Sequence, residues 1–184
     1  MNDTRHQREA RFNLLYAAHY SALRAYAWRR RPDLADDVVA ETFAIVWRDL
    51  ERVPEEPLPW LFGIARNVRL NLLRDERRQA ERDARGAADA AIHDSFPCFT
   101  TFIEEHSALC GALDQLPERD REVLVLTAWE HLDRDEIAAA LGCSRATVGV
   151  RLFRARRRLA AALAEAELHP TSPTIDARSL TDEC

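Results

Sequence analysis

Residues 133–159 read DRDEIAAALGCSRATVGVRLFRARRRL, and this stretch decides the fold more than any other part of the chain. Asp133, followed three residues later by Glu136, forms a capping-box pattern that predicts the start of a short helix. Gly142 predicts a tight turn at the end of that helix, and Ser144 is placed to cap a second one. Three consecutive alanines in the first helix would allow the two helices to cross closely. This layout is typical of a DNA-binding helix-turn-helix.

The second helix of this pair, predicted over 145–163, has an apolar face and a basic face. At about 100° per residue, Val148, Leu152 and Ala155 fall on one side, which we expect to pack inward. Six arginines and no acidic residue occur between 145 and 158, whereas a merely solvated helix normally mixes both signs. The bias favours contact with DNA phosphates and base edges. The candidates on the outward face and its flanks are Arg145, Val150, Arg151, Phe153, Arg154, Arg157 and Arg158.

Apolar residues recur at spacings of three and four along most of the chain, which predicts an all-α protein. The predicted helices span 9–29, 34–50, 59–78, 108–115, 118–130, 133–141 and 145–163. Helical periodicity is lost over residues 79–107, so we expect two small helical domains joined by a flexible linker. The predicted divisions are a first domain over 1–78, an acidic linker over 79–107, a second domain over 108–165 and a disordered tail over 166–184.

The helix predicted over 34–50 begins with negative charge. Asp33 is placed as its N-cap, and Asp36 and Asp37 follow in the first turn, where the helix dipole favours carboxylates. Its apolar stripe includes Val38 and Phe43, so we expect it to pack on its neighbours.

The helix predicted over 59–78 carries a polar row about 120° away from its core face. Amide and guanidinium groups hydrogen-bond base edges, and an indole can stack on an unpaired base, so the row is a candidate for single-stranded DNA. A surface for a partner helix, with a tryptophan at the edge of the core, explains the spacing equally well. The row consists of Trp60, Gly63, Asn67, Asn71, Arg74 and Arg78, and its candidate contact residues are Trp60, Asn67, Asn71, Arg74 and Arg78.

Composition places further bounds on function. All 26 basic residues are arginine, the formal net charge is −5, and the 79–107 segment contributes two arginines and six acids to it. No apolar run approaches the roughly 20 residues that span a bilayer, and the N-terminus does not resemble a signal peptide, so we expect a cytoplasmic protein without membrane insertion. No nucleophile or acid–base pair stands out, so we expect no catalytic residue, no cofactor and no enzyme activity.

The four cysteines form no CxxC pair, and free thiols are expected. His93, Cys98, His106 and Cys110 match no closed zinc motif, so chance proximity is favoured over a metal site.

Two blocks of the sequence resemble the sigma-70 family. Residues 36–47 (DDVVAETFAIVW) and 59–67 (PWLFGIARN) resemble its region 2. Residues 116–124 (LPERDREVL), together with the helix-turn-helix, resemble its region 4. The resemblance covers roughly 10–78 and 108–163. Both blocks in this order, in so short a chain, are similar to an extracytoplasmic-function sigma factor of RNA polymerase.

The resemblance implies a role for each surface. The loop 51–58 and the polar row of the 59–78 helix would recognise and help open the promoter −10 element. The helix over 145–158 would read the −35 element, and the acidic linker would thread through the polymerase. An anti-sigma factor would restrain the protein. The coiled coil of the polymerase β′ subunit would bind the acidic residues Asp33, Asp36, Asp37 and Glu41.

Two other functions fit parts of the sequence. The first is a stand-alone helix-turn-helix regulator whose N-terminal helices sense a ligand or dimerise. The second is a sigma-like interaction partner whose DNA binding has decayed at Gly149 and Val150, where the family often has a basic residue and serine. The acidic 34–50 helix beside the polar row favours the sigma factor, because a sensor domain would not need both.

Overall fold

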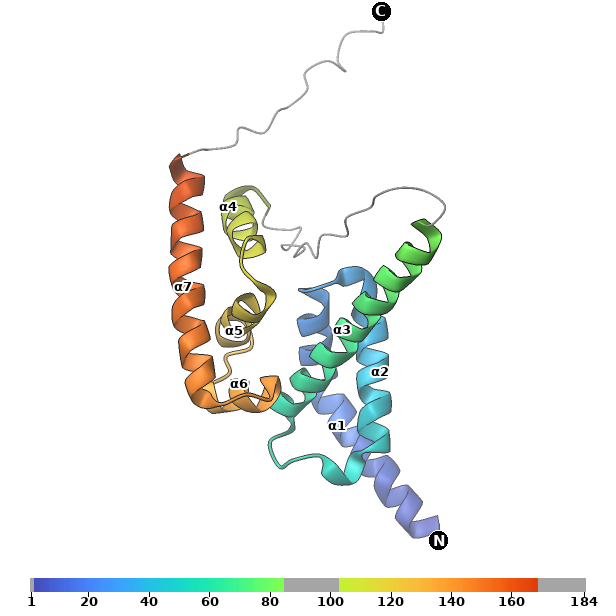
Figure 1. The fold of residues 1–184 in the computed structure, drawn as a ribbon. Helices are drawn as coiled ribbons and strands as arrows, with labels where there is room; N and C mark the ends of the chain where they lie inside the picture. Colours follow the sequence, from blue (N-terminus) through green and yellow to red (C-terminus); the bar gives the residue numbers. More distant parts are fainter. Residues whose placement is uncertain (1, 85–102, 169–184) are drawn as a thin grey trace, which may run out of the picture.

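The computed structural model describes residues 2–84 and 103–168, and within them it contains helices and no strand (Figure 1). The helices are α1 (Asn2–Trp28), α2 (Ala35–Arg48), α3 (Pro57–Ala84), α4 (Ile103–Asp114), α5 (Glu118–Ala128), α6 (Arg134–Leu141) and α7 (Arg145–Leu168). Single 3₁₀ turns, Pro32–Leu34 and Leu50–Arg52, flank α2. We call α1–α3 the N-terminal unit and α4–α7 the C-terminal unit. The all-α prediction is confirmed.

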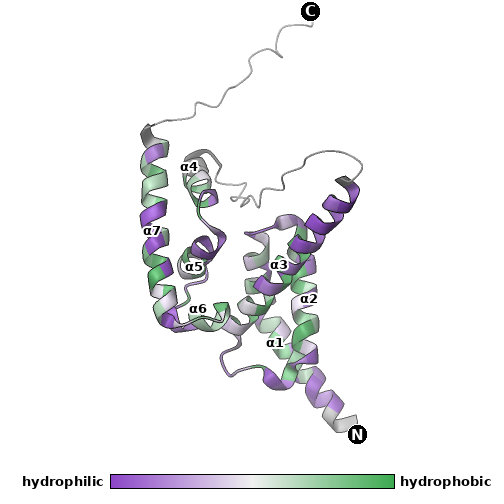
Figure 2. Ribbon diagram, viewed as in Figure 1, coloured by the Kyte–Doolittle hydropathy of each residue, from purple (hydrophilic) through white to green (hydrophobic). Residues whose placement is uncertain are grey.

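Several helices extend beyond their predicted ends through polar residues. Helix α3 continues past residue 78 to Ala84, where Gln79 donates hydrogen bonds of 3.1 and 3.2 Å to Asp83 one turn later. Figure 2 shows this end of α3 as strongly hydrophilic. A polar helix end has no apolar periodicity, so the sequence pattern could not reveal it. No helix among the described residues is long and apolar enough to cross a membrane.

The N-terminal unit packs its three helices around one apolar centre. The predicted stripe of α2 is confirmed, because Val38, Phe43 and their neighbours at helical spacing are buried. Helix α1 contributes Leu23, which is fully buried, and α3 contributes Leu61 from its predicted core face.

The C-terminal unit is built along α7, which packs against α4, α5 and α6. Its inward face is the predicted one, with Val148, Leu152 and Ala155 all buried.

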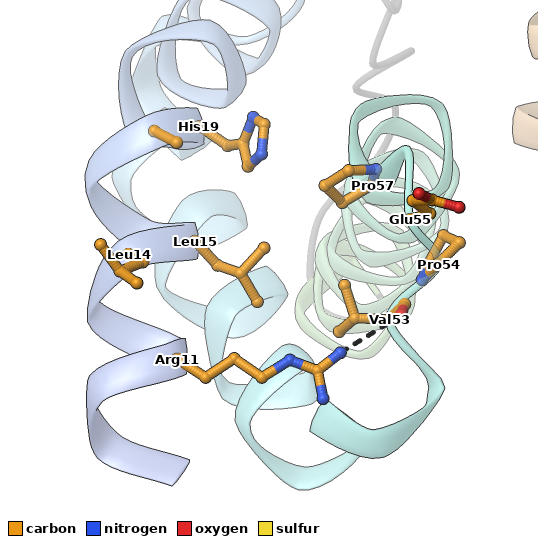
Figure 3. A pocket seen from close by; sticks show the side chains of 9 residues that line it. Arg11, Leu14, Leu15, His19, Val53, Pro54, Glu55 and Pro57 are labelled. Carbon is orange, nitrogen blue, oxygen red and sulfur yellow. Dashed lines mark hydrogen bonds between the residues drawn. The ribbon is translucent and has the colours of Figure 1, made fainter. Parts of the chain in front are cut away.

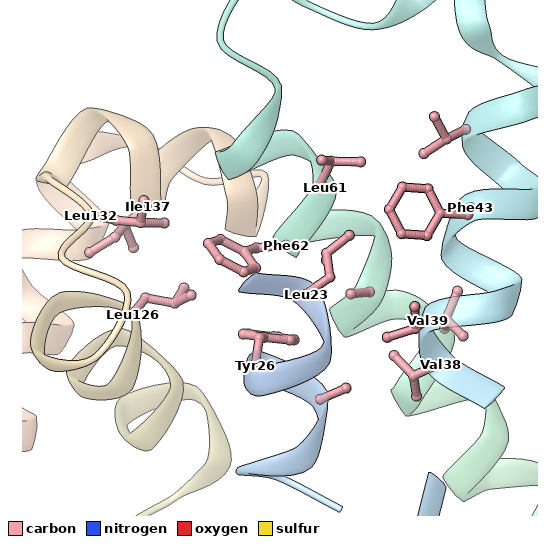
Figure 4. Packing of buried hydrophobic residues seen from close by; sticks show 14 of the residues in the cluster. Leu23, Tyr26, Val38, Val39, Phe43, Leu61, Phe62, Leu126, Leu132 and Ile137 are labelled. Carbon is pink, nitrogen blue, oxygen red and sulfur yellow. The ribbon is translucent and has the colours of Figure 1, made fainter. Parts of the chain in front are cut away.

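The two units share a hydrophobic core (Figure 4). Phe62 on α3 lies between the centre of the N-terminal unit and Leu126 and Ile137 of the C-terminal unit. It belongs to a second buried stripe on α3, with Arg69 and Leu73, that the sequence interpretation did not identify. The two predicted domains are therefore packed together in this structure, chiefly by α6 against α3.

Candidate nucleic-acid and polymerase interfaces

The helix-turn-helix forms as its capping residues predict. The Asp133 carboxylate accepts hydrogen bonds from the backbone N–H groups of Asp135 (2.7 Å) and Glu136 (2.9 Å), and the Glu136 carboxylate accepts one from the Asp133 backbone N–H at 2.7 Å. Gly142 ends α6 in the left-handed conformation, with φ 60° and ψ 41°. The Ser144 hydroxyl accepts a hydrogen bond of 3.1 Å from the backbone N–H of Thr147 and so caps α7. These local bonds fix the angle at which α7 leaves α6.

The outward face of α7 is open to solvent. Phe153 is 67% exposed and Val150 is 53% exposed, which is unusual for large apolar side chains. Arg154 and Arg157 beside them are exposed and make no ion pair with any residue that the structure describes. The face therefore combines free guanidinium groups with apolar surface, a composition suited to phosphates and thymine methyl groups.

The other three arginines predicted for this face have partners. Arg145 is paired with Asp135 at 2.5 Å, and Arg158 is paired with Asp120 of α5. Arg151 lies 3.9 Å from the sulfur of Cys143. The structure thus divides the predicted arginines into an unpaired centre and flanking residues that have partners within the C-terminal unit.

The polar row of α3 is divided along its length. Asn67, Asn71, Arg74 and Arg78 are exposed, with Arg74 donating to the Asn71 side chain at 2.5 Å. Trp60, at the N-terminal end, is partly buried against the shared core. Helix α6 packs against this end, so the row is open only over its C-terminal part.

The acidic face of α2 is exposed and lies in the N-terminal unit. Asp36 accepts a hydrogen bond of 3.2 Å from Arg24, while Asp37 and Glu41 have no ion pair within the described part of the chain. The prediction that Asp33 caps α2 is wrong. The helix begins after Leu34, and the Asp33 carboxylate is instead held by Arg31 through bonds of 2.8 and 2.5 Å.

The Arg31 contact also sets the charge of Asp33. Hydrogen bonding from that guanidinium lowers the pKa of Asp33. Asp33 is therefore held as a carboxylate at neutral pH, and all four predicted acids are exposed.

A cavity of about 410 Å³ opens between α1 and the loop that precedes α3 (Figure 3). Arg11 reaches across it and donates to the Val53 carbonyl at 3.5 Å, and burial lowers the pKa of His19. The family resemblance implied a role for this loop, but it did not indicate that α1 forms the other wall of the cavity. The lining residues are Arg11, Leu14, Leu15, Ala18, His19, Val53, Pro54, Glu55 and Pro57.

A buried ionic cluster joins the two units and was missed by the sequence interpretation. Glu122 of α5 is 3% exposed and accepts hydrogen bonds from Tyr26 (2.9 Å) and Arg30 (3.0 Å), with Arg69 at 3.5 Å. Burial opposes the charge of Glu122, but the two guanidinium groups outweigh it, and its pKa is lowered. Burial raises the pKa of Tyr26, which therefore stays protonated as the donor.

Further ion pairs surround this cluster. Arg69 is also paired with Glu118, and Arg29 is paired with Glu130, again across the two units. The low exposure of these arginines could not be foreseen, since each is paired with a glutamate far away in the sequence.

The cysteines differ from one another. Cys143 is a free thiol as predicted, but the prediction is wrong for Cys110, which is disulfide-bonded. His93 and Cys98 of the unfavoured zinc hypothesis lie outside the described residues, and no group of potential ligands within the described ranges could hold a metal ion.

Models of known protein families match both halves of the chain. Residues 15–79 match the family model described as sigma-70 region 2, and residues 108–159 match that of sigma-70 region 4. The chain is 36% identical over 146 residues to the ECF RNA polymerase sigma factor EcfG of Rhodopseudomonas palustris, covering 77% of this chain and 79% of that protein.

Two solved structures share the fold. The sigma factor RpoE of Bartonella quintana, determined with the anti-sigma factor NepR, aligns with a TM-score of 0.63 at 28% identity, covering 83% of this chain and 96% of RpoE. CnrH, determined with the cytosolic domain of CnrY, aligns with a TM-score of 0.56 at 30% identity, covering 84% of this chain and 88% of CnrH.

The same family is indicated by the two helical units, by their order along the chain and by the similarity over most of its length. The chain belongs to the extracytoplasmic-function sigma factors of the sigma-70 family, and its function is promoter-specific initiation of transcription by RNA polymerase.

Proposed function

We propose that the outward face of α7 reads the promoter −35 element in the major groove. The observation that carries this assignment is the pairing of two free arginines, Arg154 and Arg157, with the exposed side chains of Val150 and Phe153. Arginine recognises guanine through two parallel hydrogen bonds, and an apolar side chain favours the thymine methyl group. The proposed −35 sequence therefore contains a guanine next to a thymine.

Arg145, Arg151 and Arg158 have a different proposed role at the same surface. Each guanidinium group already has a partner within the protein, and its remaining N–H donors would bind a DNA phosphate without breaking that contact. They would position α7 on the DNA backbone rather than select a base.

We assign the −10 element to α3 and the loop before it. Asn67, Asn71, Arg74 and Arg78 supply hydrogen-bond donors on an exposed helix face. The neighbouring loop forms one wall of the cavity, opposite α1. The size of this cavity and its mixed polar and apolar lining suit an unpaired base. Trp60 would stack on a base only after α6 has moved away from this end of α3.

The acidic face of α2 is proposed to bind the β′ coiled coil of core RNA polymerase. Asp37 and Glu41 lie one helical turn apart and are unpaired among the described residues, while Asp33 and Asp36 extend the same charge toward the start of the helix. Exposed carboxylates of this kind accelerate and orient association with a basic surface.

An anti-sigma factor is the proposed regulator, because two sigma factors of similar fold have been determined with such a protein or with a cytosolic domain. The proposed site of action is the cytoplasm, and we assign no catalytic residue and no cofactor.

The assignment is tested by mixing the purified protein with bacterial core RNA polymerase and transcribing fragmented genomic DNA. Specific initiation from promoters that share two sequence elements is the expected result. Absence of both core binding and initiation would favour the stand-alone regulator, and duplex binding by α7 alone would then be measured.

A further inference from the structure

The cavity between α1 and the loop before α3 carries a positive charge at one end. Arg11 reaches from α1 toward the loop and makes no ion pair with any residue that the structure describes, the neighbouring Glu55 included (Figure 3). Its Nη2 atom donates to the Val53 carbonyl at 3.5 Å, which is long for a hydrogen bond. A guanidinium group has five N–H donors in a planar fork, so Arg11 keeps donors for a ligand in the cavity.

His19 lies at the other end of the cavity, eight residues further along α1. Eight residues of an α-helix rise about 12 Å, so the two polar side chains are separated along the length of the cavity. Burial lowers the pKa of His19, so its imidazole is uncharged at neutral pH and has one N–H donor and one acceptor nitrogen. The cavity therefore offers paired donors at one end and an acceptor at the other.

Apolar side chains line the space between these two ends. Leu15 and Ala18 come from α1, and Val53, Pro54 and Pro57 come from the loop. A flat base suits such a space, because its hydrogen-bonding groups lie on its edges and its two faces pack against apolar side chains.

Guanine is the base whose edges match both ends of the cavity. Its O6 and N7 atoms are neighbouring acceptors that receive two parallel N–H bonds from an arginine. Its N2 amino group lies on the opposite edge and supplies a donor for the acceptor nitrogen of His19. Adenine and thymine do not present two neighbouring acceptors on one edge. Cytosine presents O2 and N3, but its opposite edge carries only C–H groups.

We infer that Arg11 selects an unpaired guanine of the −10 element, binding its O6 and N7 atoms while His19 binds its N2 amino group. The inference rests on the proposed role of the cavity and adds the identity of the base and of the residue that reads it. The family resemblance directed attention to the loop 51–58, whereas both of these side chains belong to α1.

The test is transcription by core RNA polymerase and the full-length protein from a promoter library with randomised −10 positions. We expect the wild type to favour guanine at one of these positions, by roughly fivefold to over a hundredfold. Arg11→Ala is expected to abolish this preference and to keep the preferences at the other positions. Arg11→Lys is expected to do the same, because an ammonium group keeps the charge but lacks the planar fork. Arg5→Ala removes an exposed arginine of α1 outside the cavity and is the matched control.

Replacing the selected guanine by 7-deazaguanine isolates a single contact, since this analogue lacks the N7 acceptor. The replacement is expected to weaken initiation by the wild type. It is expected to have no further effect on Arg11→Ala, because the contact is already absent from that variant.

Two results would overturn the inference. The first is a wild type without a guanine preference, or a preference that Arg11→Ala leaves intact. The second is an equal loss of initiation at every −10 sequence with Arg11→Ala that Arg11→Lys restores, because this pattern identifies a phosphate contact and not a base contact.

Ala18→Leu tests the underlying role of the cavity separately. Ala18 is exposed on the cavity wall, so a larger side chain enters the cavity at little cost to the fold. Unchanged initiation with Ala18→Leu would refute the proposed role of the cavity, and the inference with it. Weaker initiation with Ala18→Leu, combined with an unaltered base preference in Arg11→Ala, would overturn only the choice of guanine by Arg11.

Discussion

Tyr26 on α1 donates a hydrogen bond of 2.9 Å to the carboxylate of Glu122 on α5, although 96 positions separate the two residues in the sequence. Both side chains are buried, and Arg30 and Arg69 complete the surroundings of the carboxylate. The contact joins the N-terminal and C-terminal units, so its strength contributes to how firmly the two units pack together.

The stability of the chain is expected to depend on pH through Glu122. Its pKa is lowered in the folded protein, so its contribution is complete above the ordinary glutamate pKa, about 4.3, and is lost as the pH falls through the folded pKa. Glu122→Gln removes the charge at every pH and leaves two arginines uncompensated, a loss of up to about 3–5 kcal/mol. Separation of the units limits this loss, because the arginines regain water.

Urea unfolding at several pH values measures this effect. The difference between wild type and Glu122→Gln is expected to be constant from pH 7 to about pH 5 and to shrink below about pH 4.3. Glu165→Gln, at an exposed position on α7, is the control and is expected to change stability by less than about 0.5 kcal/mol. A difference that stays constant down to pH 3 would contradict the ionic role of Glu122.

Two glycines of the C-terminal unit are expected to respond oppositely to alanine. Gly142 has φ 60°, a conformation in which a Cβ atom approaches the following carbonyl, so Gly142→Ala is expected to cost about 1–2 kcal/mol. Gly149 lies inside α7 with space around it, so Gly149→Ala is expected to stabilise by up to about 1 kcal/mol. Chemical unfolding followed by circular dichroism compares them, and equal effects would contradict the assigned turn.

Loss of either free arginine of α7 is expected to weaken initiation at promoters that depend on the −35 element. Arg154→Ala and Arg157→Ala each remove a proposed DNA contact, worth about 1–3 kcal/mol where it reads a base, or roughly fivefold to over a hundredfold in initiation. Arg156→Ala removes the same charge from the flank of this face, about 100° around the helix from Arg157, and serves as the control. In vitro transcription at two salt concentrations is the measurement, and equal loss in all three variants would indicate a general charge effect instead.

The acidic face of α2 is expected to control affinity for core polymerase. The double variant Asp37→Asn/Glu41→Gln removes two exposed carboxylates that have no ion pair among the described residues, so the fold is expected to remain intact. Two ion pairs of about 1 kcal/mol each correspond to roughly a ten- to thirtyfold weaker complex. A competition assay for core binding, with Glu165→Gln as the control, measures the change. Unchanged binding would exclude this face as the contact.

Local features of the fold were predictable from the sequence, and contacts between distant segments were not. The stripe of α2 and the caps at Asp133, Gly142 and Ser144 follow from residue types at short spacings, and each is present. Asp33 was misplaced because a competing partner, Arg31, two residues away, holds its carboxylate.

The largest structural feature that the sequence did not predict is the second buried face of α3. An arginine such as Arg69 is normally expected at a solvent-exposed position, and here the carboxylates of Glu118 and Glu122 on α5 compensate for its burial. The cavity beside α1 was missed for the same reason, since its two walls come from segments about 40 residues apart.

Gly63 on α3 lies so close to Ala140 on α6 that a Cβ atom added to it would be 2.6 Å from the Ala140 carbonyl oxygen, and this has a genetic consequence. Every glycine codon becomes an alanine codon by a change of its second base. A single base change is therefore enough to place a side chain where the fold leaves room for none and to disturb the packing of α6 on α3.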